Sequence, residues 1–113
     1  MSMKGQRDEI PPGTLEMLIL QVLVRSHPLH GFAIADEIQQ RSDDVLQVEE
    51  GSLYPALQRM LMKGWIEGNW SRTPENRRAR YYRPTEEGRR QLQRETERYD
   101  RVAHAIARVL RPA

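Results

Sequence analysis

The chain of 113 residues contains no cysteine. That absence excludes disulfides, thiolate nucleophiles and cysteine-based zinc or iron–sulfur sites, and it agrees with a reducing compartment. No apolar run approaches the roughly 20 residues that a membrane-spanning helix needs. The longest run, Met17-Leu-Ile-Leu, is interrupted by Gln21, and the first ten residues are too polar for a signal peptide. We therefore expect a cytoplasmic protein with no membrane partner.

Residues that carry catalysis are also scarce. The seven glycines are isolated from one another, so no phosphate-binding loop is present. His27 and His30 are separated by Pro28 and have no carboxylate close to them in sequence, which argues against a metal site. His104 has no neighbouring nucleophile of the kind that a hydrolytic triad requires. We expect no enzyme activity, no metal and no cofactor.

Aromatic residues make up only 6% of the chain and charged residues 30%. The net charge is +2, but it is unevenly distributed. Residues 28–50 contain six acids and one base, a net of −5, whereas residues 71–83 contain five bases and one acid, a net of +4. A cationic strip of this kind attracts a polyanion even when the whole molecule is nearly neutral. The alternative is a hairpin whose charges serve only solubility.

The first half of the chain predicts a flexible N-terminal arm over residues 1–12 and helices over about 14–26 and 31–41. The first helix is apolar on more than one face, so a partner chain is expected to cover part of it. In the second helix, Phe32, Ile34, Ala35 and Ile38 are expected to face inward. The alternation around residues 46–48 suggests a very short strand.

The third predicted helix, over residues 52–63, carries most of the functional information. Leu53, Leu57, Met60 and Leu61 recur at helical spacing and form one buried stripe. Ser52 is the expected N-cap, which places Pro55 in the first turn, and Gly64 is expected to end the helix. The opposite face offers donors and cations without a carboxylate.

A hairpin and a final helix follow. Strands over about 65–70 and 80–83 bracket a turn-rich, basic segment, which predicts a two-stranded wing. Thr85 is expected to cap a helix whose apolar residues recur at heptad-like spacing after Tyr99, with Gly88 as a local weakness. The predicted fold is mainly α with a small β-hairpin wing. Residues 13–84 are expected to form a winged helix-turn-helix DNA-binding domain and residues 85–113 a C-terminal dimerisation helix.

In such a fold the third helix enters the major groove of DNA and the wing holds neighbouring phosphates. The predicted DNA contacts are Ser52, Tyr54, Pro55, Gln58, Arg59 and Lys63 on the helix and Arg77, Arg78 and Arg80 on the wing. Two alternatives stay open, because Tyr54 could pack against the wing and capping alone explains Ser52. The wing arginines have only Glu75 as a nearby acid, so intramolecular pairing cannot use all of them.

Five motifs in order give the chain a specific resemblance to a known family. They are Gly13-Thr-Leu-Glu-Met-Leu-Ile-Leu, Leu29-His-Gly-Phe-Ala-Ile, Glu50-Gly-Ser-Leu-Tyr-Pro-Ala-Leu, Lys63-Gly-Trp-Ile and Arg80-Tyr-Tyr-Arg-Pro-Thr-Glu-Glu-Gly. Across residues 13–108 the chain resembles the PadR-like transcriptional regulators, and its single short C-terminal helix resembles their smaller subgroup. Phe32 stands where tyrosine is frequent in that family.

The resemblance implies a homodimeric repressor that binds a double-stranded DNA operator with an inverted repeat and responds to a small aromatic or drug-like effector. The expected dimer interface combines the first and last helices: Leu15, Leu18, Ile19, Val22, Leu92, Tyr99, Val102, Ala103, Ile106, Val109 and Leu110. Two other functions stay open. One is a winged helix that binds protein or ligand without DNA, and the other is RNA binding by aromatic stacking.

Overall fold

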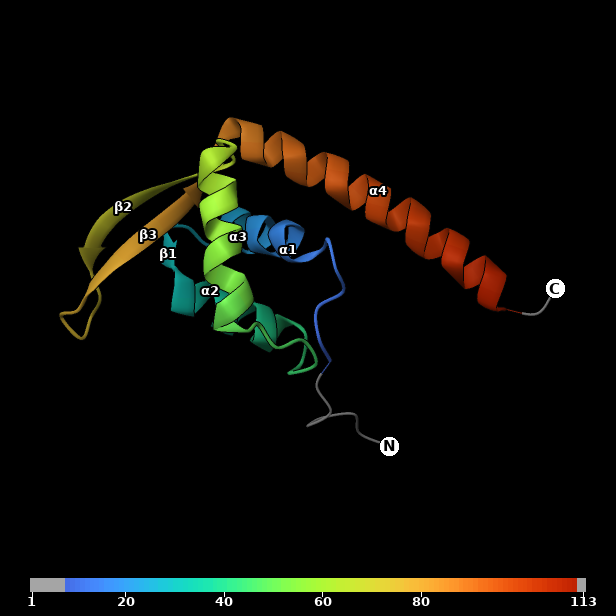
Figure 1. Cartoon of the computed structure of the whole chain (residues 1–113), viewed down its shortest axis with the longest axis horizontal. Helices are drawn as coiled ribbons and strands as arrows, with labels where there is room; N and C mark the ends of the chain where they lie inside the picture. The colour runs from blue at the N-terminus through green and yellow to red at the C-terminus, as the bar shows by residue number, and fades with distance from the viewer. Residues whose placement is uncertain (1–7, 112–113) are drawn as a thin grey trace.

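The computed structural model describes residues 8–111. Within them, four helices and three strands follow one another as α1 (Leu15–Arg25), β1 (Leu29–His30), α2 (Gly31–Arg41), α3 (Glu50–Met62), β2 (Ile66–Arg72), β3 (Arg78–Pro84) and α4 (Glu86–Leu110). Figure 1 shows the wing of β2 and β3 leaving the body on one side and α4 on the other. The fold is mainly helical with a small antiparallel sheet, which confirms the predicted winged helix-turn-helix with a C-terminal helix.

The sheet has the strand order β1-β3-β2, and both pairs are antiparallel. The β2–β3 hairpin confirms the predicted wing. The two-residue strand β1 was not predicted, although it pairs Leu29 with Tyr82 and joins the wing to the start of α2. The predicted strand at 46–48 is wrong, because only a single parallel bridge between Asp8 and Leu46 forms there.

The core lies where α1 contacts the other helices and the base of the wing. Its fully buried side chains come from α1, α2 and α3: Ile19, Leu20, Leu23, Ile34, Leu53, Leu57 and Met60. Ile66 of β2, Tyr82 of β3 and Leu92 of α4 complete the cluster. At about 25 cal/mol per Å² of apolar surface, their burial is the main force that holds the wing and α4 against the helices.

The start of α3 differs from the prediction. The N-cap is Glu49, whose carbonyl accepts hydrogen bonds from the backbone N–H groups of Ser52 and Leu53 at 3.0 and 2.9 Å. Ser52 is therefore inside the first turn, and the prediction that it caps the helix is wrong. Pro55 lies inside the helix rather than at its start, so the helix lacks the backbone hydrogen bond that this residue's N–H would make.

The end of α3 follows the prediction. Gly64 has a φ of 75°, a left-handed conformation that glycine adopts without strain. Its N–H donates to the carbonyl of Leu61 at 3.1 Å, and the N–H of Trp65 donates to Met60 at 3.0 Å. This pair of bonds is the Schellman motif that closes a helix on a glycine.

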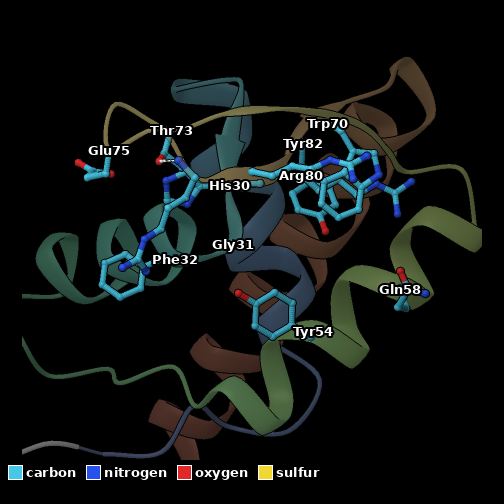
Figure 2. Close-up of a pocket in the computed structure, with 13 residues that line it drawn as sticks. His30, Gly31, Phe32, Tyr54, Gln58, Trp70, Thr73, Glu75, Arg80 and Tyr82 are labelled. Carbon is cyan, nitrogen blue, oxygen red and sulfur yellow. Dashed lines mark hydrogen bonds between the residues drawn. The ribbon is translucent and has the colours of Figure 1, made fainter.

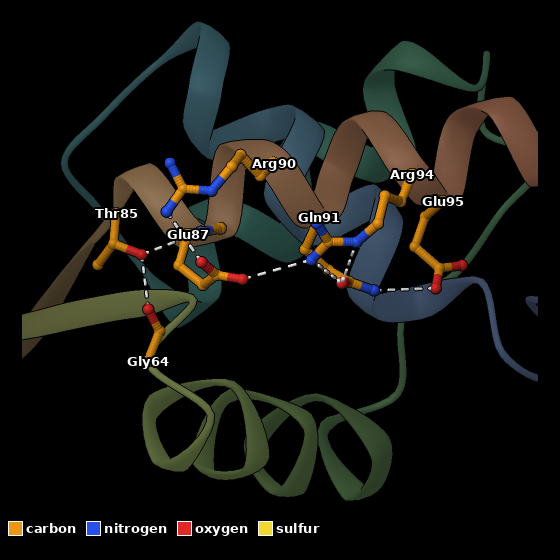
Figure 3. A network of polar contacts seen from close by, with 8 residues as sticks. Gly64, Thr85, Glu87, Arg90, Gln91, Arg94 and Glu95 are labelled. Atoms are coloured by element: carbon orange, nitrogen blue, oxygen red, sulfur yellow. Dashed lines mark hydrogen bonds and ion pairs between the residues drawn. The ribbon is translucent and has the colours of Figure 1, made fainter.

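The start of α4 is fixed to the end of α3 (Figure 3). Thr85 caps α4 as predicted, since its hydroxyl accepts from the N–H of Gly88 at 3.0 Å, and it also donates to the carbonyl of Gly64 at 2.6 Å. Gly88 is buried, and a Cβ there would collide with the carbonyl oxygen of Trp65. Gly88, which the sequence marked as a weak point of the helix, is thus the residue at which α4 lies directly against the backbone of Trp65.

Only part of the predicted N-terminal arm belongs to the described residues. There the N–H of Asp8 donates to the carbonyl of Val45 at 2.8 Å, and Ile10 packs against the core. Residues 1–7 of that arm lie outside the part that the structure describes. Within residues 8–111 no helix is both long and apolar enough to cross a membrane.

Candidate nucleic-acid interface

The exposed face of α3 lies opposite its buried stripe. Helical spacing places Gly51, Pro55, Gln58 and Met62 along the centre of this face. The apolar side chain of Met62 is 86% exposed. Around Gly51 there is open space, since a Cβ at that position would meet nothing within 4 Å. The face is therefore open for another molecule to approach closely.

The wing directs one of its two faces toward α3. Side chains alternate along a strand, so Trp70, Arg78 and Arg80 share a face with the buried Ile66 and Tyr82. The guanidinium of Arg78 lies over the indole of Trp70, 4.7 Å from the ring centroid. This stacking holds a cation at a defined place on an exposed surface.

The turn of the wing places a further cation at the tip. The backbone N–H of Arg77 donates to the hydroxyl of Thr73 at 3.1 Å, and the side chain of Arg72 donates to the carbonyl of Asn76 at 3.1 Å. Among residues 8–111, neither Arg77 nor Arg78 nor Arg80 forms an ion pair. This agrees with the expectation that intramolecular acids cannot neutralise the wing.

A cavity of about 710 Å³ separates the wing from α2 and α3 (Figure 2). Five of the nine predicted DNA contacts line it, and they come from both α3 and the wing: Tyr54, Gln58, Arg77, Arg78 and Arg80. The aromatic rings of Phe32, Trp70 and Tyr82 line the same cavity. The structure thus joins the helix and the wing into one concave, cationic surface.

Tyr54 occupies the junction of this surface with α2. Its ring lies against Gly31, where a Cβ would be 3.0 Å from Cε1 of the tyrosine, and Figure 2 shows the ring beside that residue. The side chain remains 47% exposed. Tyr54 therefore packs against the start of α2, and it keeps half of its surface available for a ligand.

The other helix residues point elsewhere. Nε of Arg59 lies 2.9 Å from Oε2 of Glu16 on α1. Lys63 places its ammonium 4.6 Å from the ring centroid of Trp65. Both cations line a second cavity, of about 310 Å³, between α1, α3 and α4. Ser52 lines a third depression, beside residues 9–13. The predicted set is therefore divided between two edges of α3, and the prediction missed the carboxylate beside Arg59.

Several residues at the main cavity were missed or misplaced. Phe32 is 73% exposed, so the prediction that it faces inward is wrong. The position of Phe32 around the helix could have predicted this exposure. At about 100° per residue, Phe32 lies about 200° from the buried Ile34 and on the same side as Asp36. His30 accepts from the N–H of Ala33 at 3.2 Å and caps α2. His30 also lines the cavity and belongs to strand β1, which was not predicted from the sequence.

The electrostatics at the cavity floor involve one phenol and one guanidinium. Burial raises the pKa of Tyr82, and the nearby positive charge of Arg80 opposes that change. Tyr82 therefore stays protonated at neutral pH and serves as a neutral, mostly apolar floor. No group of three or more potential metal ligands occurs within residues 8–111.

The predicted dimer residues fall into three groups, which differ in how exposed their side chains are. Ile19, Val22 and Leu92 are at most 8% exposed and belong to the core of the single chain, so they have little surface left for a second copy. The C-terminal half of α4 is different, since its apolar side chains lie open on one helical face. These residues are Tyr99, Val102, Ile106, Val109 and Leu110. Leu15, Leu18 and Ala103 are partly buried.

Comparison with known proteins shows which chains share this arrangement. Residues 19–94 match the family model described as the transcriptional regulator PadR-like family. A PadR family transcription regulator from Clostridium difficile is 27% identical, with a TM-score of 0.74, over 88% of this chain and 100% of that one. A PadR-like transcriptional regulator from Bacillus cereus is 26% identical, with a TM-score of 0.73, over 89% and 95%.

Two further relatives extend the comparison. A transcriptional regulator from Clostridium thermocellum shares the fold, with a TM-score of 0.80 at 24% identity over 88% of this chain and 95% of that chain. An uncharacterized protein of Lysinibacillus sphaericus is 30% identical over 86 residues, which is 76% of this chain and 78% of that protein.

Proposed function

Because the chain belongs to the PadR-like family and is therefore a DNA-binding transcriptional regulator, we propose that it is a cytoplasmic homodimeric repressor acting at an inverted-repeat operator. The observation that carries the proposal is the single concave surface shared by α3 and the wing. This surface combines hydrogen-bonding side chains with three arginines that form no ion pair with any other residue between positions 8 and 111. A module that binds only protein or ligand has no need for such unpaired cations.

Each part of the surface suits a part of the DNA. Tyr54 and Gln58 have donors and acceptors for base edges in the major groove, and Pro55 and Met62 offer apolar contact to a thymine methyl. Arg77 and Arg78 hold phosphates beside the groove and displace counterions. Ser52, Arg59 and Lys63 lie on the far edge of α3, where we assign them to the flanking backbone.

The homodimer is proposed to form through α4. Its exposed apolar face follows a heptad-like spacing from Tyr99 to Leu110, and we assign the partly buried Leu15 and Leu18 of α1 to the same interface. Pairing of two such faces would hold two copies of α3 together. We expect them to enter successive major grooves about 34 to 36 Å apart, as in other dimeric helix-turn-helix proteins.

We also propose a small aromatic effector, on the family resemblance. The second cavity, beside Trp65, reaches α1, α3 and α4 together, so a ligand there would contact both the recognition helix and the dimerisation helix. Titration of planar aromatic compounds should change the tryptophan fluorescence. No change at millimolar concentration would remove this part of the proposal.

The DNA proposal predicts different effects for two alanine substitutions. Arg78→Ala should weaken binding to operator and random duplexes alike. It should also reduce the salt slope, the steepness with which the logarithm of the binding constant falls with the logarithm of the salt concentration, by about 0.9, the value for one phosphate contact. Tyr54→Ala should weaken operator binding by about 30-fold, the middle of the range of about 1–3 kcal/mol for a base contact, with little effect on random DNA. Binding is measured by fluorescence anisotropy across a salt series, on duplexes selected from a random pool by the unchanged protein.

A control substitution is available on the outer face of β2. Ser71→Ala is exposed and should leave both affinities unchanged. Equal binding of the unchanged protein and an Arg77/Arg78/Arg80 triple alanine variant at low salt would contradict the proposed interface.

A further inference from the structure

On the inner face of the wing, Arg80 has a different environment from the two arginines nearer the tip. Trp70 lies opposite Arg80 across the hairpin, and Gly68 lies opposite Tyr82. Because side chains alternate along strands, these four residues occupy the same face. Arg78 stacks on Trp70, whereas Arg80 extends the other way, toward the base of the wing.

Arg80 crosses the neighbouring strand where that strand has no side chain. A Cβ at Gly68 would lie 2.6 Å from Nε of Arg80 and 3.3 Å from its Cγ and Cδ. The stem and the Nε of the arginine thus lie directly against the glycine backbone. Any side chain at position 68 would occupy this space and force the guanidinium to move.

The guanidinium is held with one nitrogen buried and without a partner. Nε of Arg80 has almost no accessible surface and no hydrogen bond to any residue that the structure describes. Leaving a donor unpaired is unfavourable, so we attribute the position of the side chain to its packing against Gly68. Its terminal nitrogens have no partner within residues 8–111 either. Figure 2 shows Arg80 beside Tyr82 and Trp70 on the wing.

We propose that Gly68 is a positioning residue, which fixes Arg80 as a preorganised phosphate contact at the junction of α3 and the wing. The proposal rests on the DNA-binding function proposed above. A guanidinium that is already immobilised loses little side-chain entropy on binding, and a contact to a backbone phosphate fixes register and orientation on the duplex. Arg80 thereby sets the depth at which α3 enters the groove.

The test compares Gly68→Ala, Arg80→Ala, the double variant and Asn69→Ala with the unchanged protein. Asn69 is the matched control, because it is an exposed neighbour on the opposite face of β2. Affinity for the selected duplex is measured across a salt series. Each single variant should lose about tenfold in affinity, and its salt slope should fall by about 0.9, the value for one phosphate contact. The double variant should bind no more weakly than Arg80→Ala, because both changes remove the same contact.

Other results would overturn the inference. These are an unchanged salt slope in Gly68→Ala, or losses that add in the double variant. A partly unfolded sample does not imitate the expected result, since a reduced active fraction leaves the slope unchanged. If Gly68→Ala fails to fold, the double variant should still fold and bind like Arg80→Ala, because it has no guanidinium that collides with the new Cβ. Failure of the double variant to fold would also refute the inference. Absence of DNA binding by the unchanged protein would instead contradict the proposed function.

Discussion

At the residue scale, the structure separates cations that are available from cations that are already occupied. Arg59 and Arg80 are both predicted DNA contacts, but Arg59 is paired with Glu16 while Arg80 has no acidic partner among the described residues. The partner of Arg59 lies 43 positions away along the chain. Sequence pattern therefore predicted where the positive charge is but not which charges are neutralised.

Removing the acid that holds Arg59 tests this distinction. Glu16→Gln should free Arg59 for DNA, raise the affinity for random duplexes a few-fold and steepen the salt slope by about 0.9. Stability should fall by no more than about 1 kcal/mol, because the pair is partly exposed. Anisotropy titrations across a salt series give both quantities.

The matched control is Glu67→Gln, which removes the same charge from the exposed outer face of the wing. If both variants bind random DNA equally well, net charge is responsible, and the pairing of Arg59 with Glu16 does not limit its contact with DNA.

At the element scale, the joint between α3 and α4 determines how the DNA-binding unit is attached to the C-terminal helix. The joint consists of the Schellman end at Gly64, the hydroxyl of Thr85 that bonds both elements, and the close approach of Gly88 to Trp65. Just beyond it, Arg90 and Arg94 donate hydrogen bonds that lower the pKa of Glu87 (Figure 3). The end of α3 and the start of α4 therefore form one unit.

Two glycine substitutions in helices should have opposite effects. Gly88→Ala should destabilise the protein by about 1–3 kcal/mol, the usual cost of overpacking, because backbone rather than a flexible side chain occupies the space. Gly51→Ala should stabilise it by about 0.5–1 kcal/mol, since alanine favours the helix and the site is open. Chemical denaturation measures both. Equal stability of the two variants would show that α4 can move away from Trp65.

At the scale of the whole molecule, the apolar face of α4 from Tyr99 to Leu110 remains exposed within the described chain. Ile106→Glu should shift the protein from dimer to monomer, because it places a carboxylate at the centre of the proposed interface. His104→Glu introduces the same side chain on the other side of the helix, where it is exposed, and should leave the dimer intact. Sedimentation over a range of concentrations distinguishes the two. A stable monomer in the unchanged protein would refute the homodimer.

Element boundaries that depend on neighbours a few residues apart could be predicted from the sequence. The end of α3 at Gly64, the cap of α4 at Thr85 and the basic hairpin were all predicted, because turn and capping preferences act between residues close in sequence. The alternating and helical apolar spacing then fixed the fold class. The DNA-binding function followed from the ordered motifs, which the family match confirms.

The packing of the elements determines which of the predicted contacts share one surface. It began α3 at Glu50, exposed Phe32, paired Arg59 with Glu16 and laid Arg80 across Gly68. Each of these outcomes depends on how whole elements pack. Some bring together residues that are distant in sequence, and others follow from the orientation that the core gives to a helix. Local preferences therefore predicted the parts of the interface, and packing determined its shape and its available charges.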